Sequence, residues 1–73
     1  MTIRELLAKT LARLIAEKGQ SVAQTARDLG YTRQRLHQLK TGDRTAAPEA
    51  IEEAINKLGY EVDGMTIKQK ENE

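Results

Sequence analysis

The stretch SVAQTARDLGYTRQRLHQLKTG, residues 21–42, decides the fold of this 73-residue chain. Its apolar spacing predicts two short helices, over about 22–29 and 33–40, that meet at a sharp turn. Gly30 suits that turn, because glycine adopts the positive φ that a sharp helix end requires. The pattern therefore predicts either an ordinary αα-corner or its DNA-binding form, the helix-turn-helix.

Hydroxyl side chains mark the start of both helices. Ser21 and Gln24 form the S-x-x-Q pattern of a capping box, and Thr32 is a candidate N-cap for the second helix. The first helix repeats small and aliphatic residues at helical spacing, which predicts one buried face. That face is expected to carry Val22, Ala26 and Leu29.

The second helix has two different faces. At about 100° per residue, its two leucines fall opposite a polar face. Arginine suits guanine in the major groove and glutamine suits adenine, so the polar face favours contacts to base edges. Any surface helix also has a polar face, and a lone exposed histidine is commonly just solvated. The expected base-contacting residues are Arg33, Gln34, His37 and Gln38, and the expected core residues are Leu36 and Leu39.

Composition limits the remaining classes. The chain has no cysteine and one histidine, which excludes disulfides and thiolate or imidazole-rich metal sites. It has no glycine-rich phosphate loop, so we expect neither an enzyme nor a cofactor. With no long apolar run and no signal core, we expect no membrane span and a cytoplasmic location. Phe and Trp are absent, and so thin a core favours oligomerisation.

The rest of the chain predicts an all-α bundle of about four helices. A Thr2–Glu5 capping box starts a helix over about 3–18. Pro48 starts another that ends before Gly59. One domain over residues 1–68 is expected, followed by a disordered tail over 69–73.

After Gly59 the spacing changes to a period of two, which predicts a short strand bent at Gly64. A single strand would have no partner inside a helical domain, so we expect it to pair with its two-fold mate in a homodimer. A disordered or loosely packed tail is the alternative. The residues expected to mediate dimerisation are Tyr60, Val62, Met65 and Ile67.

With these features in place, the chain resembles the Cro and lambda-repressor (Xre-like) helix-turn-helix family over about residues 20–58. The ending LGYEV, residues 58–62, also resembles small Xre-like antitoxins, in which a strand often follows the last helix. The family usually has an apolar residue where Thr25 stands, so Thr25 must bury its hydroxyl or turn it outward. The positions that match the family pattern are Ala26, Gly30, Leu36 and Leu39.

The resemblance implies a transcriptional repressor that binds double-stranded DNA. The four polar residues named above stand at the family's base-contacting positions. Residues near the ends of the second helix are better placed for phosphates, and Arg35, between the two faces, reaches either the DNA backbone or solvent. The expected phosphate contacts are Thr32, Arg35, Lys40, Thr41 and Arg44.

Charge is divided along the chain. Residues 1–44 hold nine Lys or Arg and four Asp or Glu, a net charge of +5, whereas residues 45–73 have a net charge of −4. A DNA-facing half and a half that faces away would produce this division, as would chance clustering. The alternative function is a protein-interaction module whose acidic C-terminal part binds a partner such as a toxin or antirepressor.

Overall fold

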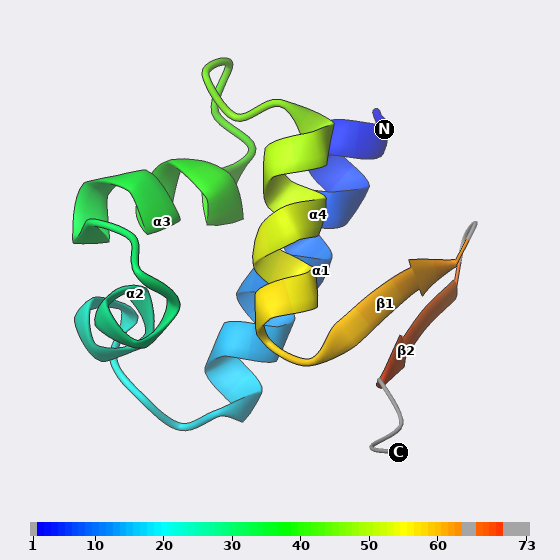
Figure 1. The fold of residues 1–73 in the computed structure, drawn as a ribbon. Coiled ribbons are helices and arrows are strands. Elements are labelled where there is room, and N and C mark those ends of the chain that lie inside the picture. Colours follow the sequence, from blue (N-terminus) through cyan, green and yellow to red (C-terminus); the bar gives the residue numbers. More distant parts are fainter. Residues whose placement is uncertain (1, 64–65, 70–73) are drawn as a thin grey trace.

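The structure is a computed structural model that describes residues 2–63 and 66–69. In these residues four helices precede two strands (Figure 1). The elements are α1 (Ile3–Glu17), α2 (Val22–Leu29), α3 (Arg33–Thr41), α4 (Pro48–Lys57), β1 (Tyr60–Asp63) and β2 (Thr66–Gln69). The predicted small helical bundle with a C-terminal strand is confirmed, and every predicted helix boundary agrees to within one residue.

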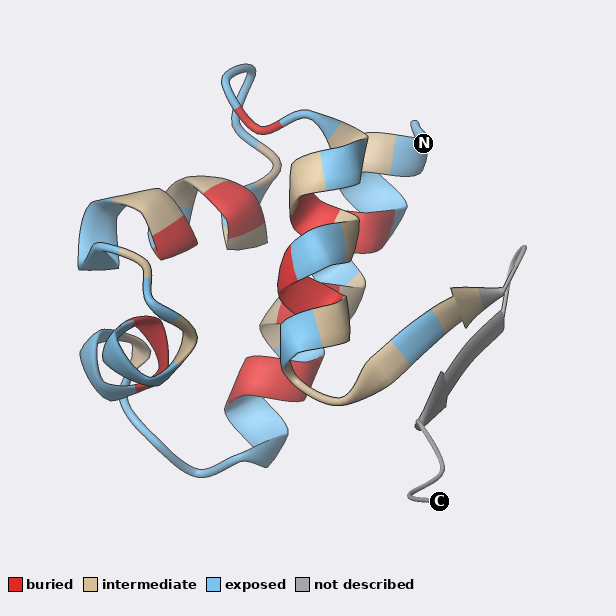
Figure 2. Cartoon of the chain, in the orientation of Figure 1, coloured by how far each residue is buried: buried red, intermediate tan, exposed pale blue. Residues whose placement is uncertain are grey.

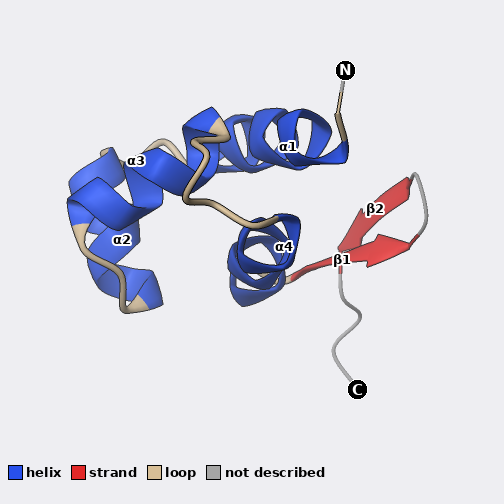
Figure 3. Ribbon diagram, turned by 90° about the horizontal axis from the view of Figure 1, so that it is seen from above, coloured by secondary structure: helices blue, strands red, loops and turns tan. Residues whose placement is uncertain are grey.

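The helices α1 and α4 pack against each other, with the α2–α3 corner on one side of this pair and the two strands on the other (Figures 1 and 3). Figure 2 shows that the buried positions face the space enclosed by the four helices. Side chains from α1, α3 and α4 meet there with no exposed surface, so the core joins the α2–α3 corner to its support. The largest of them are Leu11, Leu36, Leu39, Ile51 and Ile55. No helix in the described part of the chain has the length and apolar character needed to cross a membrane.

Two capping boxes were predicted, and one is complete. At the start of α1, Glu5 N donates to Thr2 Oγ1 at 3.2 Å, and Thr2 N donates back to Glu5 Oε1 at 3.5 Å. At the start of α2, Gln24 N donates to Ser21 Oγ at 3.1 Å. The reciprocal bond predicted there is wrong: the Gln24 side chain instead donates from Nε2 to Asp28 Oδ1 at 3.0 Å, one helical turn further on.

Left-handed glycines end both helices of the corner. Gly30 has φ 82°, and the next N–H, that of Tyr31, donates to the Ala26 carbonyl at 2.8 Å. Gly42 has φ 71°, and Asp43 N donates to the Gln38 carbonyl at 3.1 Å. Both are Schellman-type endings, which satisfy the last carbonyls of a helix.

The corner also packs against and bonds to the rest of the domain. Thr25 is fully buried, which settles the two possibilities for this residue, and its Oγ1 has no hydrogen-bond partner among the described residues. The turn between α2 and α3 is tied to α4 by Lys57, whose Nζ donates to the Leu29 carbonyl at 3.4 Å and lies 4.4 Å from the Tyr31 ring centroid. The corner is therefore held by tertiary as well as local contacts.

The C-terminal strand pairs within the chain, so the expectation that it would have no intrachain partner is wrong. β1 and β2 form an antiparallel pair in which Tyr60 lies opposite Gln69 and Val62 opposite Ile67. The reason is that the alternating pattern is long enough for two four-residue strands. Gln69, the first residue of the predicted tail, is the last residue of β2. Gly64, Met65 and residues 70–73 lie outside the described residues.

Candidate nucleic-acid interface

The four predicted base-contacting residues lie on α3, but they are not equally exposed. Arg33, Gln34 and His37 are exposed, whereas Gln38 is half-buried. The opposite side of α3 holds Leu36 and Leu39, which are fully buried. The predicted division of this helix into a core face and a polar face is therefore confirmed.

The first turn of α2 lies beside this polar face. Residues from the two helices line one open concavity: Ser21, Val22, Ala23, Arg33, Gln34, His37 and Lys40. The N–H groups of a first helical turn have no partner further back in the helix, and the end of the helix carries partial positive charge. The concavity therefore combines backbone donors with two cationic side chains, a combination suited to phosphate.

Residues 21–23 were not among the predicted DNA-contacting residues. A signal was present, because Ser21 was recognised as the N-cap of α2 and a helix N-terminus is a ready anion site. What the sequence did not show is that this N-terminus opens toward the polar face of α3. That relation depends on the crossing of the two helices.

Hydroxyl groups at the ends of α3 bond to its backbone. Thr32 Oγ1 accepts from Arg35 N at 3.0 Å, which confirms Thr32 as the N-cap. Thr41 Oγ1 donates to the His37 carbonyl at 2.8 Å. Lys40 is half-buried and lines the concavity.

The loop after α3 is ordered by Asp43. Its Oδ1 accepts from both the backbone N and the Oγ1 of Thr45, each at 2.9 Å. These two bonds, the backbone one first, hold the pKa of Asp43 below its ordinary value, and the positive charges of Arg35 and Arg4 add to the effect. Arg44 is exposed between the two bonded residues, so the loop presents it to solvent.

Arg35 joins α3 to this loop. Its Nη1 donates to Gln38 Oε1 at 3.4 Å and to the Thr45 carbonyl at 3.3 Å. Arg35 and Gln38 are both half-buried. One nitrogen of an expected phosphate ligand is thus already bonded within the protein.

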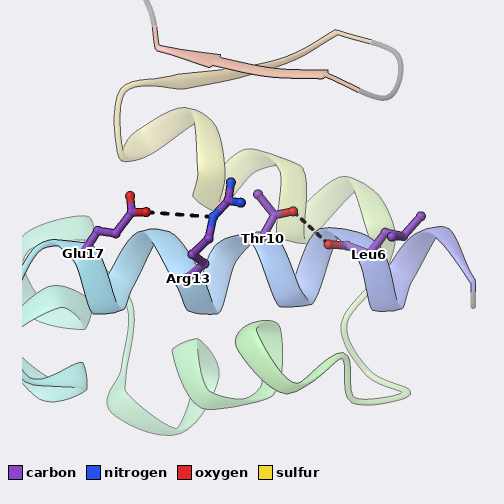
Figure 4. Close-up of polar contacts among 4 residues, drawn as sticks. All are labelled: Leu6, Thr10, Arg13 and Glu17. Carbon is purple, nitrogen blue, oxygen red and sulfur yellow. Dashed lines mark hydrogen bonds and ion pairs between the residues drawn. The ribbon is translucent and has the colours of Figure 1, made fainter.

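The side of α1 away from α2 and α3 provides a contrasting surface. Thr10 Oγ1 donates to the Leu6 carbonyl at 3.0 Å, and Arg13 pairs with Glu17 across one turn at 4.0 Å (Figure 4). Both charged side chains are more than half exposed, so the pair contributes little stability. Arg13 is a basic residue outside the α2–α3 concavity.

An exposed polar helix, packed across a second helix whose N-terminus opens beside it, defines a helix-turn-helix domain. The sequence comparison agrees: the family described as "Helix-turn-helix domain" matches residues 6–65. The chain belongs to this family, whose domains are of the Xre/Cro-like kind. Membership supports a DNA-binding regulator in general. Neither the search of curated proteins nor the search of solved structures found a match.

Proposed function

We propose that this protein is a sequence-specific transcriptional repressor that binds an inverted-repeat operator as a homodimer. The observation that carries the proposal is the shared concavity of α2 and α3, in which Arg33, Gln34 and His37 are exposed beside the first turn of α2. The net charge of +5 over residues 1–44 supplies the general attraction to DNA. No catalytic role forms part of this proposal, and the site of action is the nucleoid in the cytoplasm.

In this proposal α3 lies in the major groove and reads base edges with Arg33, Gln34, His37 and Gln38. Phosphates flank the helix, where charged or polar groups position the protein without reading sequence. The proposed phosphate contacts are Thr32, Arg35, Lys40, Thr41 and Arg44, to which the first turn of α2 adds its backbone N–H groups.

The sharpest test of this arrangement compares Arg33→Ala with Arg13→Ala. Each substitution removes one positive charge from an exposed position, but only Arg33 lies in the concavity. We expect Arg33→Ala to cost about 1–3 kcal/mol on a selected DNA site, and Arg13→Ala to cost much less. Binding is measured by fluorescence anisotropy on duplexes selected from a random pool, at several salt concentrations.

The same titrations separate reading from simple charge attraction. Affinity for random duplex DNA should fall steeply as salt increases, because each neutralised phosphate releases a counterion. Equal losses for the two arginine variants would contradict the placement of the reading face on α3. A wild-type chain that binds no duplex at low salt would contradict DNA binding altogether.

The dimer is proposed to form through the strand pair, with Tyr60, Val62, Met65 and Ile67 as the proposed contacts. In support, β1 and β2 pair only with each other among the described residues, and a two-stranded sheet has edges on which a second copy could add. Tyr60 and Val62 are also half-buried against their own core, which limits the surface that they offer.

Analytical ultracentrifugation of the full chain and of a chain truncated after Gly59 tests the dimer. We expect the full chain to dimerise and the truncated chain to be a monomer with weak operator affinity. Two reading helices in the dimer should lie about 34 Å apart, one turn of DNA. A truncated chain that still dimerises and binds an inverted repeat normally would move the interface to the helices.

The acidic end of the chain supports a second candidate function, binding of a partner protein such as a toxin or an antirepressor. Glu49, Glu53 and Glu61 are exposed along α4 and β1. β1 lies on the far side of α4 from α2 and α3 (Figure 3). If this candidate is correct, the chain retains little affinity for DNA at low salt but binds a basic partner.

A further inference from the structure

The contact between Arg35 and Gln38 bears on which base α3 reads. Nη1 of Arg35 carries two hydrogens, and its two acceptors are Gln38 Oε1 at 3.4 Å and the Thr45 carbonyl at 3.3 Å. Gln38 stands one turn beyond Arg35 on α3. The charged side chain thus bridges a proposed base-reading residue and the loop that follows the helix.

The chemistry of the two groups fixes which way round the Gln38 amide lies. A guanidinium has only donors, whereas a carboxamide has an oxygen acceptor and an NH₂ donor. Only the oxygen can bond to Arg35, so an inverted amide would place two donors face to face. With Oε1 turned to Arg35, the Nε2 group points away from it.

The orientation of the amide changes the base that Gln38 matches. Adenine presents an acceptor, N7, and a donor, the N6 amino group, so reading it with two hydrogen bonds requires both amide atoms. Guanine presents two adjacent acceptors, N7 and O6, which suit an NH₂ group alone. Glutamine usually pairs with adenine, and Arg35 already occupies one of the two lone pairs of the oxygen that this pairing uses, whereas the NH₂ group that guanine requires is unaffected.

We propose that Arg35 is a positioning residue that sets base preference: by holding Oε1 of Gln38, it makes Gln38 a donor and favours guanine over adenine at the base pair that Gln38 reads. The inference rests on the proposed function, because it requires α3 to be the reading helix. It assigns Arg35 a role in sequence specificity. A phosphate contact, by contrast, raises the affinity for all DNA sequences equally.

The anchor for Arg35 is a tertiary one. Thr45, whose carbonyl accepts from Arg35, is itself fixed by two bonds to Asp43, and Ala46 beside it is fully buried. A half-buried arginine held at a fixed carbonyl has fewer orientations than a solvated one. The loop therefore restricts the arginine, and the arginine orients the amide.

The test is selection of bound duplexes from a random-sequence DNA pool by the full chain and its variants. Gln38→Ala identifies the base position that Gln38 reads, because the preference at that position disappears. Arg35→Met removes the donors but keeps an unbranched side chain. We expect the guanine-to-adenine ratio at the Gln38 position to fall about tenfold in Arg35→Met, with the other positions unchanged.

A control separates this effect from loss of charge. Arg13→Met removes the same charge from α1 and should leave the base ratio within about twofold of wild type. Asp43→Ala releases Thr45, the anchor of Arg35, and should lower the base ratio in the same direction as Arg35→Met but by less. In the double variant Arg35→Met with Gln38→Ala, the arginine substitution should have no further effect on base preference. If Arg35→Met does not keep its helical circular dichroism, Arg35→Lys takes its place, because lysine keeps the charge but lacks the planar fork.

The outcomes distinguish the inference from the function beneath it. An unchanged base ratio in the folded Arg35 variant, or an even loss of affinity for all sequences, overturns the positioning role and leaves DNA reading intact. A Gln38→Ala variant with wild-type preferences overturns it as well, because there is then no reading residue to orient. If the wild-type chain selects no sequence at all, the proposed function fails and the inference fails with it.

Discussion

The two helices of the corner and α4, which supports them, begin in different ways. α2 and α3 each begin at a hydroxyl side chain that accepts a backbone N–H and end at a glycine in the left-handed region. α4 begins at Ala47, which makes no side-chain capping bond, although a left-handed glycine, Gly59 with φ 95°, follows it as well. Local hydrogen bonds thus define the reading helices more completely than they define α4.

Burial of apolar side chains differs in the opposite sense, because α4 buries more of them than α3 does. α4 buries Ile51, Ala54 and Ile55 within ten residues, whereas α3 buries two leucines within nine and presents the rest of its surface outward. A helix that must expose a polar face has little apolar area for packing, and a helix of this length is marginal on its own. Caps at both ends offset that deficit, because they fix where the exposed helix starts and stops.

Leu39→Ala gives the largest effect expected from this comparison. Leu39 is fully buried and joins α3 to the core, so its truncation should lower the free energy of unfolding by about 2–5 kcal/mol. A domain of this size rarely has a larger free energy of unfolding than this loss, so the helical circular-dichroism signal should disappear near room temperature. Leu6→Ala, at a side chain that is 38% exposed on α1, is the matched control with a small expected effect. A fully folded Leu39→Ala variant would show that caps alone hold α3.

Ala47→Asp should give α4 the N-terminal capping bond that α3 already has. Ala47 is exposed and already has the extended φ of −63° and ψ of 148° that an N-cap requires. An aspartate there can accept a first-turn N–H and should raise the free energy of unfolding by about 1 kcal/mol. Chemical denaturation measures the gain, and Ala47→Leu, which has no acceptor, should show none. Equal stability of the Asp and Leu variants would mean that α4 does not need a cap.

Thr25→Val tests whether the buried hydroxyl of Thr25 lowers the stability of the corner. The Thr25 hydroxyl is buried without a hydrogen-bond partner among the described residues, and valine has nearly the same shape without the polar group. We expect a gain in the free energy of unfolding of up to about 1 kcal/mol, with DNA affinity unchanged. Thr10→Val on α1, where the hydroxyl does bond to a carbonyl, should not gain. A loss of stability in Thr25→Val would indicate that the hydroxyl is satisfied in solution.

The Asp43 loop should give the smallest effect, a local dependence on pH. Because the folded pKa of Asp43 lies below its ordinary value, its contribution is complete above that ordinary value and is lost as the pH falls through the folded pKa. An NMR titration of the Asp43 carboxyl should have a depressed midpoint. In Thr45→Val the midpoint should move only part of the way back, because the backbone bond from residue 45 remains. A full return to the ordinary pKa would assign the shift to the hydroxyl alone.

The features that the sequence determined by itself are those set by contacts within about one helical turn. Capping hydroxyls, glycines at helix ends and apolar spacing involve residues at most five apart, so they predicted the bounds of all four helices to within one residue. The two faces of α3 followed for the same reason, because a helix places residues at fixed angles. Residues 21–42 therefore predicted a helix-turn-helix directly from the order of their side chains.

Tertiary structure alone decided how these pieces meet. Arg35 reaches Thr45 ten residues away only because the loop folds back beside α3. The strand at residue 60 pairs with residues 66–69, where spacing had indicated a strand but not what it would pair with. In each case one donor or strand edge has several chemically equivalent partners. Sequence spacing does not distinguish between those partners. Only the packing of the folded chain brings one of them within bonding distance.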